Sequence, residues 1–231
     1  MMRLLALDTA TDRCSAALWC DGRVLARSVH APRRQAEILL PLFDELLAEA
    51  GIVGEQLDAI ACGRGPGAFT GVRLAVSVAQ GVALALDRPV VPVSSLAALA
   101  LAAPPEATNV LAIMDARMGE VYAGMFRRTP VLPVEPLCRE SVGAAAHVSV
   151  DGPGPWFGVG SGWSVYAEAL RQRCAGIALT GVDADAQPEA VAVATIGAAS
   201  FARSGGQPAA ELLPVYLRDK VALTRLERGQ S

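Results

Sequence analysis

Residues 63–73 read Gly-Arg-Gly-Pro-Gly-Ala-Phe-Thr-Gly-Val-Arg, and the elements on both sides are best interpreted from this stretch. The apolar run over 57–62 predicts a strand, and residues 72–86 predict a helix. Glycine allows backbone angles that other residues avoid, and proline restricts one φ and removes one N–H donor. We therefore expect a structural strand-to-helix loop, with Thr70 as a candidate helix cap. Its members are Gly63, Gly65, Pro66, Gly67, Thr70 and Gly71.

Two phosphate-binding interpretations of this loop are weaker. Gly63-x-Gly65-x-x-Ala68 formally fits a dinucleotide-binding fingerprint. That fingerprint also needs an acidic residue at the end of the next strand, and Asp87 comes before that strand. A P-loop needs a lysine after its last glycine, and Lys220 is the only lysine of the chain. A tight structural turn is the interpretation that needs no ligand.

Length and composition indicate a two-domain cytoplasmic protein. The 231 residues exceed the common domain size of about 100–150 residues. The net charge of −3 argues against a protein whose main task is to neutralise phosphates, so nucleic-acid contacts should be local or shared with a partner. The five cysteines are scattered without a C-x-x-C pair, which suggests neither disulfides nor a thiolate metal site. We see no signal peptide and no membrane span, which would need ~20 apolar residues.

The hydrophobic patterns divide the chain at a Pro-rich boundary over 103–106. The first part, residues 1–104, predicts antiparallel strands over 4–8, 14–20 and 23–30, a helix over 35–50, the elements around the glycine loop, a strand over 90–93 and a helix ending at 102. The second part, residues 105–231, repeats the opening, because 110–115 echoes 4–8 and a strand over 120–126 follows. A strand over 156–160, helices over 164–173 and 189–203, and a tail complete it. The chain is therefore α/β, with two related halves.

The helices expected over 35–50 and 72–86 carry more apolar surface than one sheet can cover. Apolar residues occupy about half the circumference of the first helix. Only Arg73, Ser77 and Gln80 bring polar side chains to the second. We expect the outer faces of this helix pair to bind another protein. The candidate contact residues are Leu39, Phe43, Arg73, Leu74, Ser77, Val78 and Leu84.

Two halves that each place an acid at the end of the first strand resemble the duplicated ribonuclease-H-like architecture of actin, sugar kinases and the Hsp70 ATPase. The resemblance implies mixed sheets flanked by helices, and a nucleotide held by the first hairpin. The corresponding candidates are Asp8, Thr9 and Thr11. ATP-binding members usually have glycine in this turn, whereas residues 8–13 read Asp-Thr-Ala-Thr-Asp-Arg, so we expect a weak site or one shared with a partner. An independent ATP-binding kinase or ATPase is the alternative function.

Four segments narrow the resemblance to one family. They read Leu-Ala-Leu-Asp-Thr-Ala-Thr (5–11), Gly-Pro-Gly-Ala-Phe-Thr-Gly-Val-Arg (65–73), Met-Asp-Ala-Arg-Met-Gly-Glu-Val-Tyr (114–122) and Pro-Val-Tyr-Leu-Arg (214–218). The sequence resembles the bacterial TsaB (YeaZ) family of tRNA threonylcarbamoyladenosine biosynthesis. The resemblance implies a non-catalytic scaffolding subunit, required for threonylcarbamoyl transfer to the adenosine next to the tRNA anticodon. Its implied partner is TsaD, the metal-bearing transferase.

The family also implies further partners. These are a small ATPase, TsaE, and a second copy of the chain in a homodimer, while tRNA is contacted only through the complex. No cofactor is expected to be tightly bound, and ATP or ADP is expected only at a subunit interface. A self-associating structural protein is a further alternative.

The residues that are missing agree with a non-catalytic role. The metal-bearing paralogue is expected to hold its metal through a His-x-x-x-His pair, whereas His30 and His147 are the only histidines here. We therefore expect no metal and no catalytic residues. The remaining charged cluster is the second-domain turn of Asp115, Arg117 and Glu120. Two interpretations stay open for this cluster. It contacts a partner protein or a shared nucleotide, or it is a charged turn held by an internal arginine–carboxylate pair.

Overall fold

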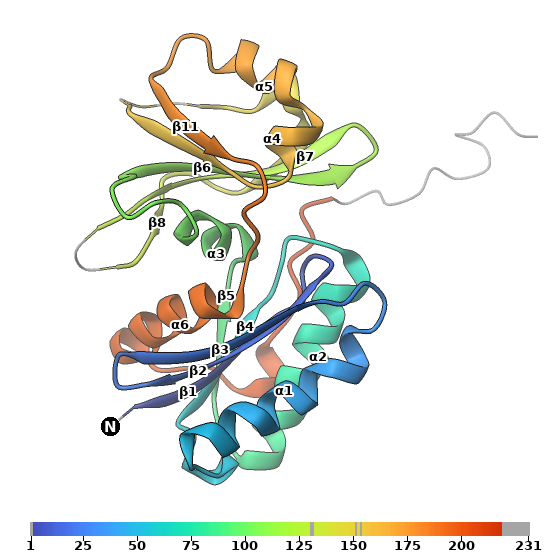
Figure 1. The fold of residues 1–231 in the computed structure, drawn as a ribbon, viewed down its shortest axis with the longest axis vertical. Helices are drawn as coiled ribbons and strands as arrows, with labels where there is room; N and C mark the ends of the chain where they lie inside the picture. Colours follow the sequence, from blue (N-terminus) through green and yellow to red (C-terminus); the bar gives the residue numbers. More distant parts are fainter. Residues whose placement is uncertain (1, 130–131, 151, 153, 219–231) are drawn as a thin grey trace, which may run out of the picture.

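The computed structural model describes residues 2–129, 132–150, 152 and 154–218, and contains two mixed sheets flanked by helices (Figure 1). The first sheet has the order β3-β2-β1-β4-β5. Strands β1 to β3 pair antiparallel, and β4 and β5 continue the sheet in parallel with β1. Their bounds are β1 (Arg3–Asp8), β2 (Arg13–Cys20), β3 (Arg23–His30), β4 (Ala59–Gly63) and β5 (Val90–Val93). The predicted α/β class is confirmed.

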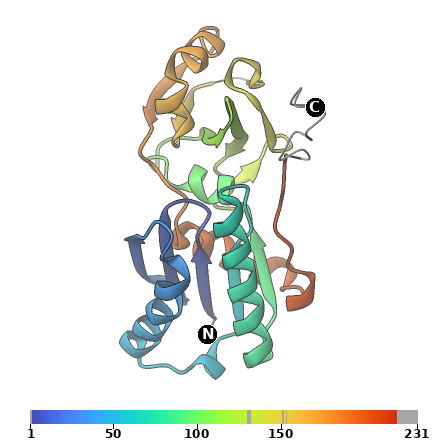
Figure 2. The same cartoon turned by 90° about the vertical axis from the view of Figure 1, so that its right-hand side faces the viewer.

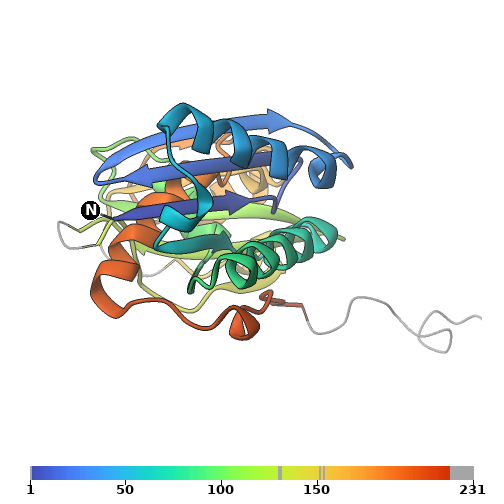
Figure 3. The ribbon, with the colours of Figure 1, turned by 90° about the horizontal axis from the view of Figure 1, so that it is seen from below.

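Side chains of β1 alternate between two cores on opposite faces of the first sheet. Leu5 and Leu7 pack beneath α1 (Gln35–Ala50) and α2 (Phe69–Leu86), which lie on the same face (Figure 3). Leu4 and Ala6 face α6 (Ala190–Ser204) on the other side. Small residues line this second face, and a Cβ on Gly197 would lie 2.7 Å from the Cβ of Ala61. Helix α6 therefore lies very close to the sheet.

The second sheet has the order β11-β10-β6-β7-β8, and β9 pairs with β7. Its strands are β6 (Asn109–Arg117), β7 (Glu120–Arg127), β8 (Glu135–Pro136), β9 (Ser141–Ala144), β10 (Trp156–Val159) and β11 (Leu179–Asp183). Helices α4 (Gly162–Val165) and α5 (Ala167–Arg173) pack on one face, and α3 (Ser95–Leu101) packs on the other. The remaining 3₁₀ turns are η1 (Gly54–Gln56), η2 (Ala145–His147) and η3 (Ala209–Glu211).

The contacts of α3 and α6 correct the division of the chain at residue 104. Helix α6 and the segment after it were expected in the second part, but they pack on the first sheet, where Gln207 and Val90 exchange two backbone hydrogen bonds of 2.9 Å. Helix α3 lies in the first range but packs on the second sheet. Figure 2 shows the chain after α6 following the first sheet and then rising toward the second. An apolar helix face is buried wherever a matching surface exists, whatever its place in the sequence.

Helix α2 begins at Phe69, three residues before the expected start. Its N-cap is Ala68, and no side chain caps it, so the candidate role of Thr70 as a cap is wrong. Of the helices in the described ranges, α2 alone has the length and hydropathy that would allow it to cross a membrane. Its buried residues, which include Ala75, Val76 and Ala79, instead pack in the core of the first half.

Candidate functional site

Asp8 ends β1 and is enclosed by the glycine loop and the start of α3. The backbone N–H of Ala10 donates to Oδ1 at 2.8 Å, and the Ser95 hydroxyl donates to Oδ2 at 2.9 Å. The residue is only 1% exposed, and this burial raises the pKa of Asp8 to about 6, against the opposing effect of both hydrogen bonds. The carboxyl group therefore has its partners inside the protein.

The loop glycines lie where no side chain would fit against the first hairpin. A Cβ on Gly63 would lie 1.9 Å from Oδ2 of Asp8, and a Cβ on Gly71 would lie 1.9 Å from the carbonyl oxygen of Thr9. A Cβ on Gly67 would lie 2.6 Å from the carbonyl oxygen of Ala10. The loop therefore packs closely against the hairpin at Gly63, Gly67 and Gly71.

This packing decides which candidate nucleotide contacts are accessible. Thr9 is fully buried, and its hydroxyl donates to the carbonyl of Gly71 at 2.7 Å. Asp8 and Thr9 are therefore corrected from nucleotide contacts to structural residues, because neither presents a free polar atom to a ligand. Thr11 lines the cleft between the sheets, and its contact with a nucleotide stays a prediction.

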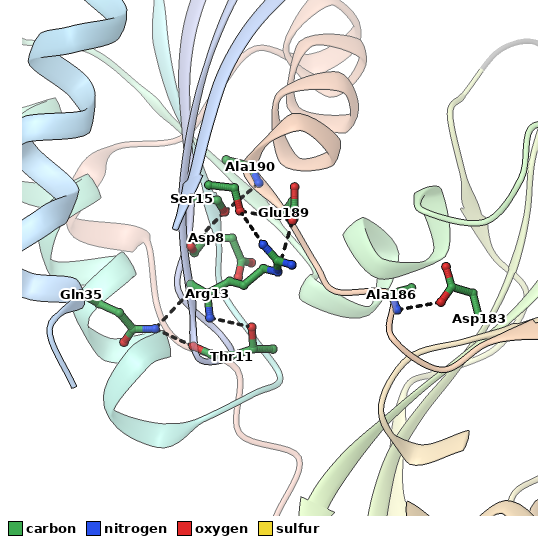
Figure 4. A network of polar contacts seen from close by, with 10 residues as sticks. Asp8, Thr11, Arg13, Ser15, Gln35, Asp183, Ala186, Glu189 and Ala190 are labelled. Atoms are coloured by element: carbon green, nitrogen blue, oxygen red, sulfur yellow. Dashed lines mark hydrogen bonds and ion pairs between the residues drawn. The ribbon is translucent and has the colours of Figure 1, made fainter. Parts of the chain in front are cut away.

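A polar network holds the hairpin between α1 and α6 (Figure 4). The side-chain amide of Gln35 donates to the carbonyls of Thr11 and Arg13, the latter at 3.1 Å. On the other side, the hydroxyl of Ser15 accepts from the N–H of Ala190 at 2.9 Å. No local sequence pattern predicts these contacts, because their partners lie far apart in the chain.

A cleft of about 720 Å³ lies between the two sheets. It is lined by the first hairpin, the start of α2, β6, α4 and the tail, and its arginines are Arg13, Arg117 and Arg218. Each faces a carboxylate, with N···O distances of 3.5 Å from Arg13 to Glu189 and 3.2 Å from Arg117 to Asp115, while Arg218 pairs with Glu120. Each of these arginines already lies within 4.0 Å of a carboxylate, so the described lining offers little unpaired positive charge to a polyphosphate.

The second-domain turn forms one ion pair within itself and a second one with the tail. Asp115 pairs with Arg117 within the turn, as one of the two alternatives proposed. Glu120 instead accepts from Nε of Arg218 at 2.9 Å. No local pattern indicates this contact, because Glu120 and Arg218 are far apart in the chain. It ties the tail, which packs on the first half, to the second sheet.

The outer face of α2 carries some of the expected partner-binding residues but not all. Leu39 and Phe43 are buried in the core, so assigning them to an outer face was wrong. Leu74 and Val78 are half-buried at the flanks of α2. An exposed stripe instead runs along the helix at intervals of three or four residues, which places its members on one face. This stripe consists of Phe69, Arg73, Ser77, Gly81 and Leu84.

At one end of the stripe, Arg73 joins two aromatic rings. Its guanidinium carbon lies 3.5 Å from the ring centroid of Phe69 and 5.4 Å from that of Tyr216. Its Nε donates to the Tyr216 hydroxyl at 2.6 Å. Both rings are about half exposed, at 48% for Phe69 and 44% for Tyr216. We call these three residues the Arg73 cluster.

Metal-ligating side chains do not gather in groups of three or more within the described ranges. His30 lines the cleft, and His147 ends η2 in the second half, so the two histidines belong to different parts of the fold. The features of the described residues that could serve a function are the exposed α2 stripe and the cleft with its ion-paired arginines.

Comparisons with known proteins identify the family. A family model described as TsaD, tRNA N6-adenosine threonylcarbamoyltransferase, matches residues 28–224. A Haemophilus influenzae protein named tRNA threonylcarbamoyladenosine biosynthesis protein TsaB is 36% identical over 97% of both chains, and the Escherichia coli protein of that name is 35% identical over 97% of this chain and 98% of its own. The solved structure of YeaZ from Pseudomonas aeruginosa is 44% identical, with a TM-score of 0.87 over 94% of this chain and 100% of that one. Full-length similarity at this level shows that the chain belongs to the TsaB (YeaZ) family, as its motifs predicted.

Proposed function

We propose that the chain is a non-catalytic, cytoplasmic subunit required for threonylcarbamoyl transfer to the adenosine next to the tRNA anticodon. Relatives that match its full length are named for threonylcarbamoyladenosine biosynthesis. The observation that carries the non-catalytic role is the filled first hairpin, where loop glycines occupy the space against Asp8 and Thr9. By analogy with the wider fold, this is where nucleotide phosphates would bind.

The chemistry of the cleft also supports a non-catalytic role. Acyl transfer needs an activated nucleophile, a metal or prearranged donors for the developing charge. Asp8 has no access to the cleft, and the arginines of the cleft face carboxylates. An independent kinase or ATPase is not favoured for the same reasons. We propose that any ATP or ADP binds at a subunit interface.

We propose that TsaD docks on the α2 stripe. The chain itself matches the TsaD family model over 28–224, so the two proteins are expected to share a sheet covered by paired helices. Such helix faces can pack against one another with their axes 8–10 Å apart. Ser77 and Gly81, at the middle of the stripe, are small and exposed, so a helix of the partner could approach α2 closely there. This surface is uncovered, since nothing lies within 4 Å of a Cβ built on Gly81.

The same face would serve a second copy of the chain when TsaD is absent, so the homodimer and the heterodimer compete. TsaE would join the assembled pair, and tRNA would be contacted through the complex. A standard interface buries about 1,600 Å² in total, which the α2 stripe supplies only together with its flanks, including Leu40 on α1. Leu84, at 68% exposure, is the largest apolar contact available near the end of α2.

Substitution of Leu84 by glutamate tests this docking. Burying a leucine contributes roughly 1.5–3 kcal/mol, and an unpaired charge left in the contact adds a further penalty. We expect Leu84→Glu to weaken binding of purified TsaD by at least ~30-fold, which corresponds to about 2 kcal/mol. Sedimentation velocity measures the complex, and incorporation of threonylcarbamoyl into tRNA measures function.

The matched control is Val182→Glu, which places the same charge at an exposed apolar position of β11 in the other half. It should bind TsaD like the parent. If Leu84→Glu is folded by circular dichroism and also binds like the parent, docking on the α2 stripe is wrong.

A further inference from the structure

Arg73 is held in place with most of its hydrogen-bonding capacity unused. A guanidinium group has five N–H donors, and Arg73 gives one of them, from Nε, to Tyr216. Stacking on the Phe69 ring at 3.5 Å covers a face of the guanidinium but uses no donor. The four donors on its two Nη atoms have no protein partner within the described ranges.

The charge of Arg73 is also unpaired in this part of the structure. Arg13, Arg27, Arg117 and Arg218 each have a carboxylate within 4.0 Å, and Arg73 has none among the residues described. A cation at the end of a largely apolar stripe would be costly to bury without a partner. A partner that buries the Arg73 guanidinium therefore binds best if it brings an opposite charge to this position.

Two distant segments fix the geometry of the Arg73 cluster. Phe69 and Arg73 lie one turn apart on α2, whereas Tyr216 comes from the tail. The tail is held on both sides of Tyr216, by the hydrogen bond from Val215 N–H to the Arg64 carbonyl at 2.8 Å and by the ion pair of Arg218 with Glu120. Because the donors are already oriented, binding loses little side-chain entropy.

We propose that the Arg73 cluster is the specificity anchor of the α2 stripe and receives a side-chain carboxylate from the docking subunit. The inference rests on the proposed function, since it assumes that TsaD covers this face. A carboxylate can accept two parallel N–H bonds from the Nη side of the guanidinium, and the Tyr216 hydroxyl still has its own proton to donate. The partner surface is therefore apolar opposite Ser77, Gly81 and Leu84, with an aspartate or glutamate opposite Arg73.

A phosphate of tRNA would satisfy the same donors, but the surroundings favour a protein carboxylate. The cluster continues into the apolar stripe, and the chain carries a net charge of −3. A phosphate-binding surface usually gathers several cations, because each neutralised phosphate adds to affinity. Here the neighbouring Arg218 is already paired with Glu120.

The test compares Arg73→Gln with Arg73→Lys in binding to TsaD at about 50 and about 300 mM salt. We expect Arg73→Gln to weaken binding about 10- to 100-fold at low salt and to reduce its salt dependence, because an ion pair is lost. Arg73→Lys should keep the salt dependence but bind less tightly than the parent, because lysine cannot form the planar two-bond contact. Tyr216→Phe keeps the ring and removes only the hydroxyl, so it should change binding by less than Arg73→Gln.

The control for charge is Arg171→Gln, an exposed position on α5 in the second half, which should leave both affinity and salt dependence unchanged. If Leu84→Glu prevents docking and Arg73→Gln does not change the salt dependence, docking stands and the carboxylate anchor is wrong. If neither substitution affects binding, docking on this face is itself wrong.

The same experiments would reveal a different group bound at the Arg73 cluster. If the double substitution Asp219→Asn and Glu227→Gln in the tail removes the salt dependence, the chain's own tail supplies the charge, which overturns the proposal. Binding of tRNA to the chain alone that is lost in Arg73→Gln would assign the cluster to a phosphate and would also overturn it. Sedimentation of the chain alone should show whether formation of a homodimer depends on Arg73. If Arg73→Gln weakens the homodimer but leaves TsaD binding unchanged, the proposal is contradicted.

Discussion

Replacing Gly71 by alanine should destabilise the first half of the protein. The added methyl group would lie 1.9 Å from the carbonyl oxygen of Thr9, about 1.5 Å short of ordinary contact at 3.4 Å. The contact atom is backbone, so α2 and the hairpin must separate, and the buried bond from the Thr9 hydroxyl to the Gly71 carbonyl is lost. Overpacking costs about 1–3 kcal/mol, and a buried hydrogen bond left unsatisfied costs about 1–3 kcal/mol more. The higher helix propensity of alanine offsets up to about 1 kcal/mol, which leaves a net loss of roughly 1–6 kcal/mol.

Thermal unfolding followed by circular dichroism measures this loss. A decrease of about 2 kcal/mol should lower Tm by roughly 4–8 °C in a chain of this size. Gly81→Ala is the matched control on the same helix, because nothing lies within 4 Å of its added methyl group and its φ is ordinary. It should stabilise the protein by about 0.5–1 kcal/mol. If both variants shift Tm in the same direction and by the same amount, the close contact of the glycine loop with the hairpin does not limit stability.

Two further predictions concern the first hairpin. Burial raises the pKa of Asp8 from 3.8 to about 6, so the folded state binds this proton more tightly than the unfolded state does. Protonation of Asp8 therefore favours folding at low pH, by roughly 3 kcal/mol, and this contribution is lost as pH rises from about 4 to about 6. Asp8→Asn should remove that part of the pH dependence in denaturant unfolding, and an unchanged profile would contradict the assignment. The isolated chain should bind ATP only weakly, because Asp8 and Thr9 are inaccessible and the cleft arginines are paired. Calorimetry showing submicromolar affinity would restore the kinase alternative.

Periodicity identified most helices and strands because its signal is local. Alternating or continuous apolar runs marked the first five strands, and the duplicated strand-Asp pattern placed β6 and β7 correctly. The short strands β8 and β9 and the Gly-containing β11 were not predicted. Their residues lack a distinct pattern, and they form strands because a neighbouring strand offers backbone partners.

For the candidate docking site, hydrophobic periodicity predicted an uncovered surface but not the residues that form it. A wide apolar arc on α1 and α2 indicated that something covers these helices, but the arc does not tell which residues meet the sheet. Leu39 and Phe43 were placed outside and lie in the core, while Arg73, Ser77 and Leu84 are indeed exposed. Phe69 was missed because the helix starts earlier than its pattern indicated.

Local patterns and short motifs are enough to identify the fold class, the family and the glycine loop. Three features depend instead on the packing of distant elements. Gly63 and Gly71 close the hairpin over Asp8 and Thr9, α6 returns to the first sheet, and Tyr216 meets Arg73 across 143 positions of the chain. Contacts at such separation depend on how whole elements pack to bury their apolar faces. No window of sequence that contains only one partner carries that information.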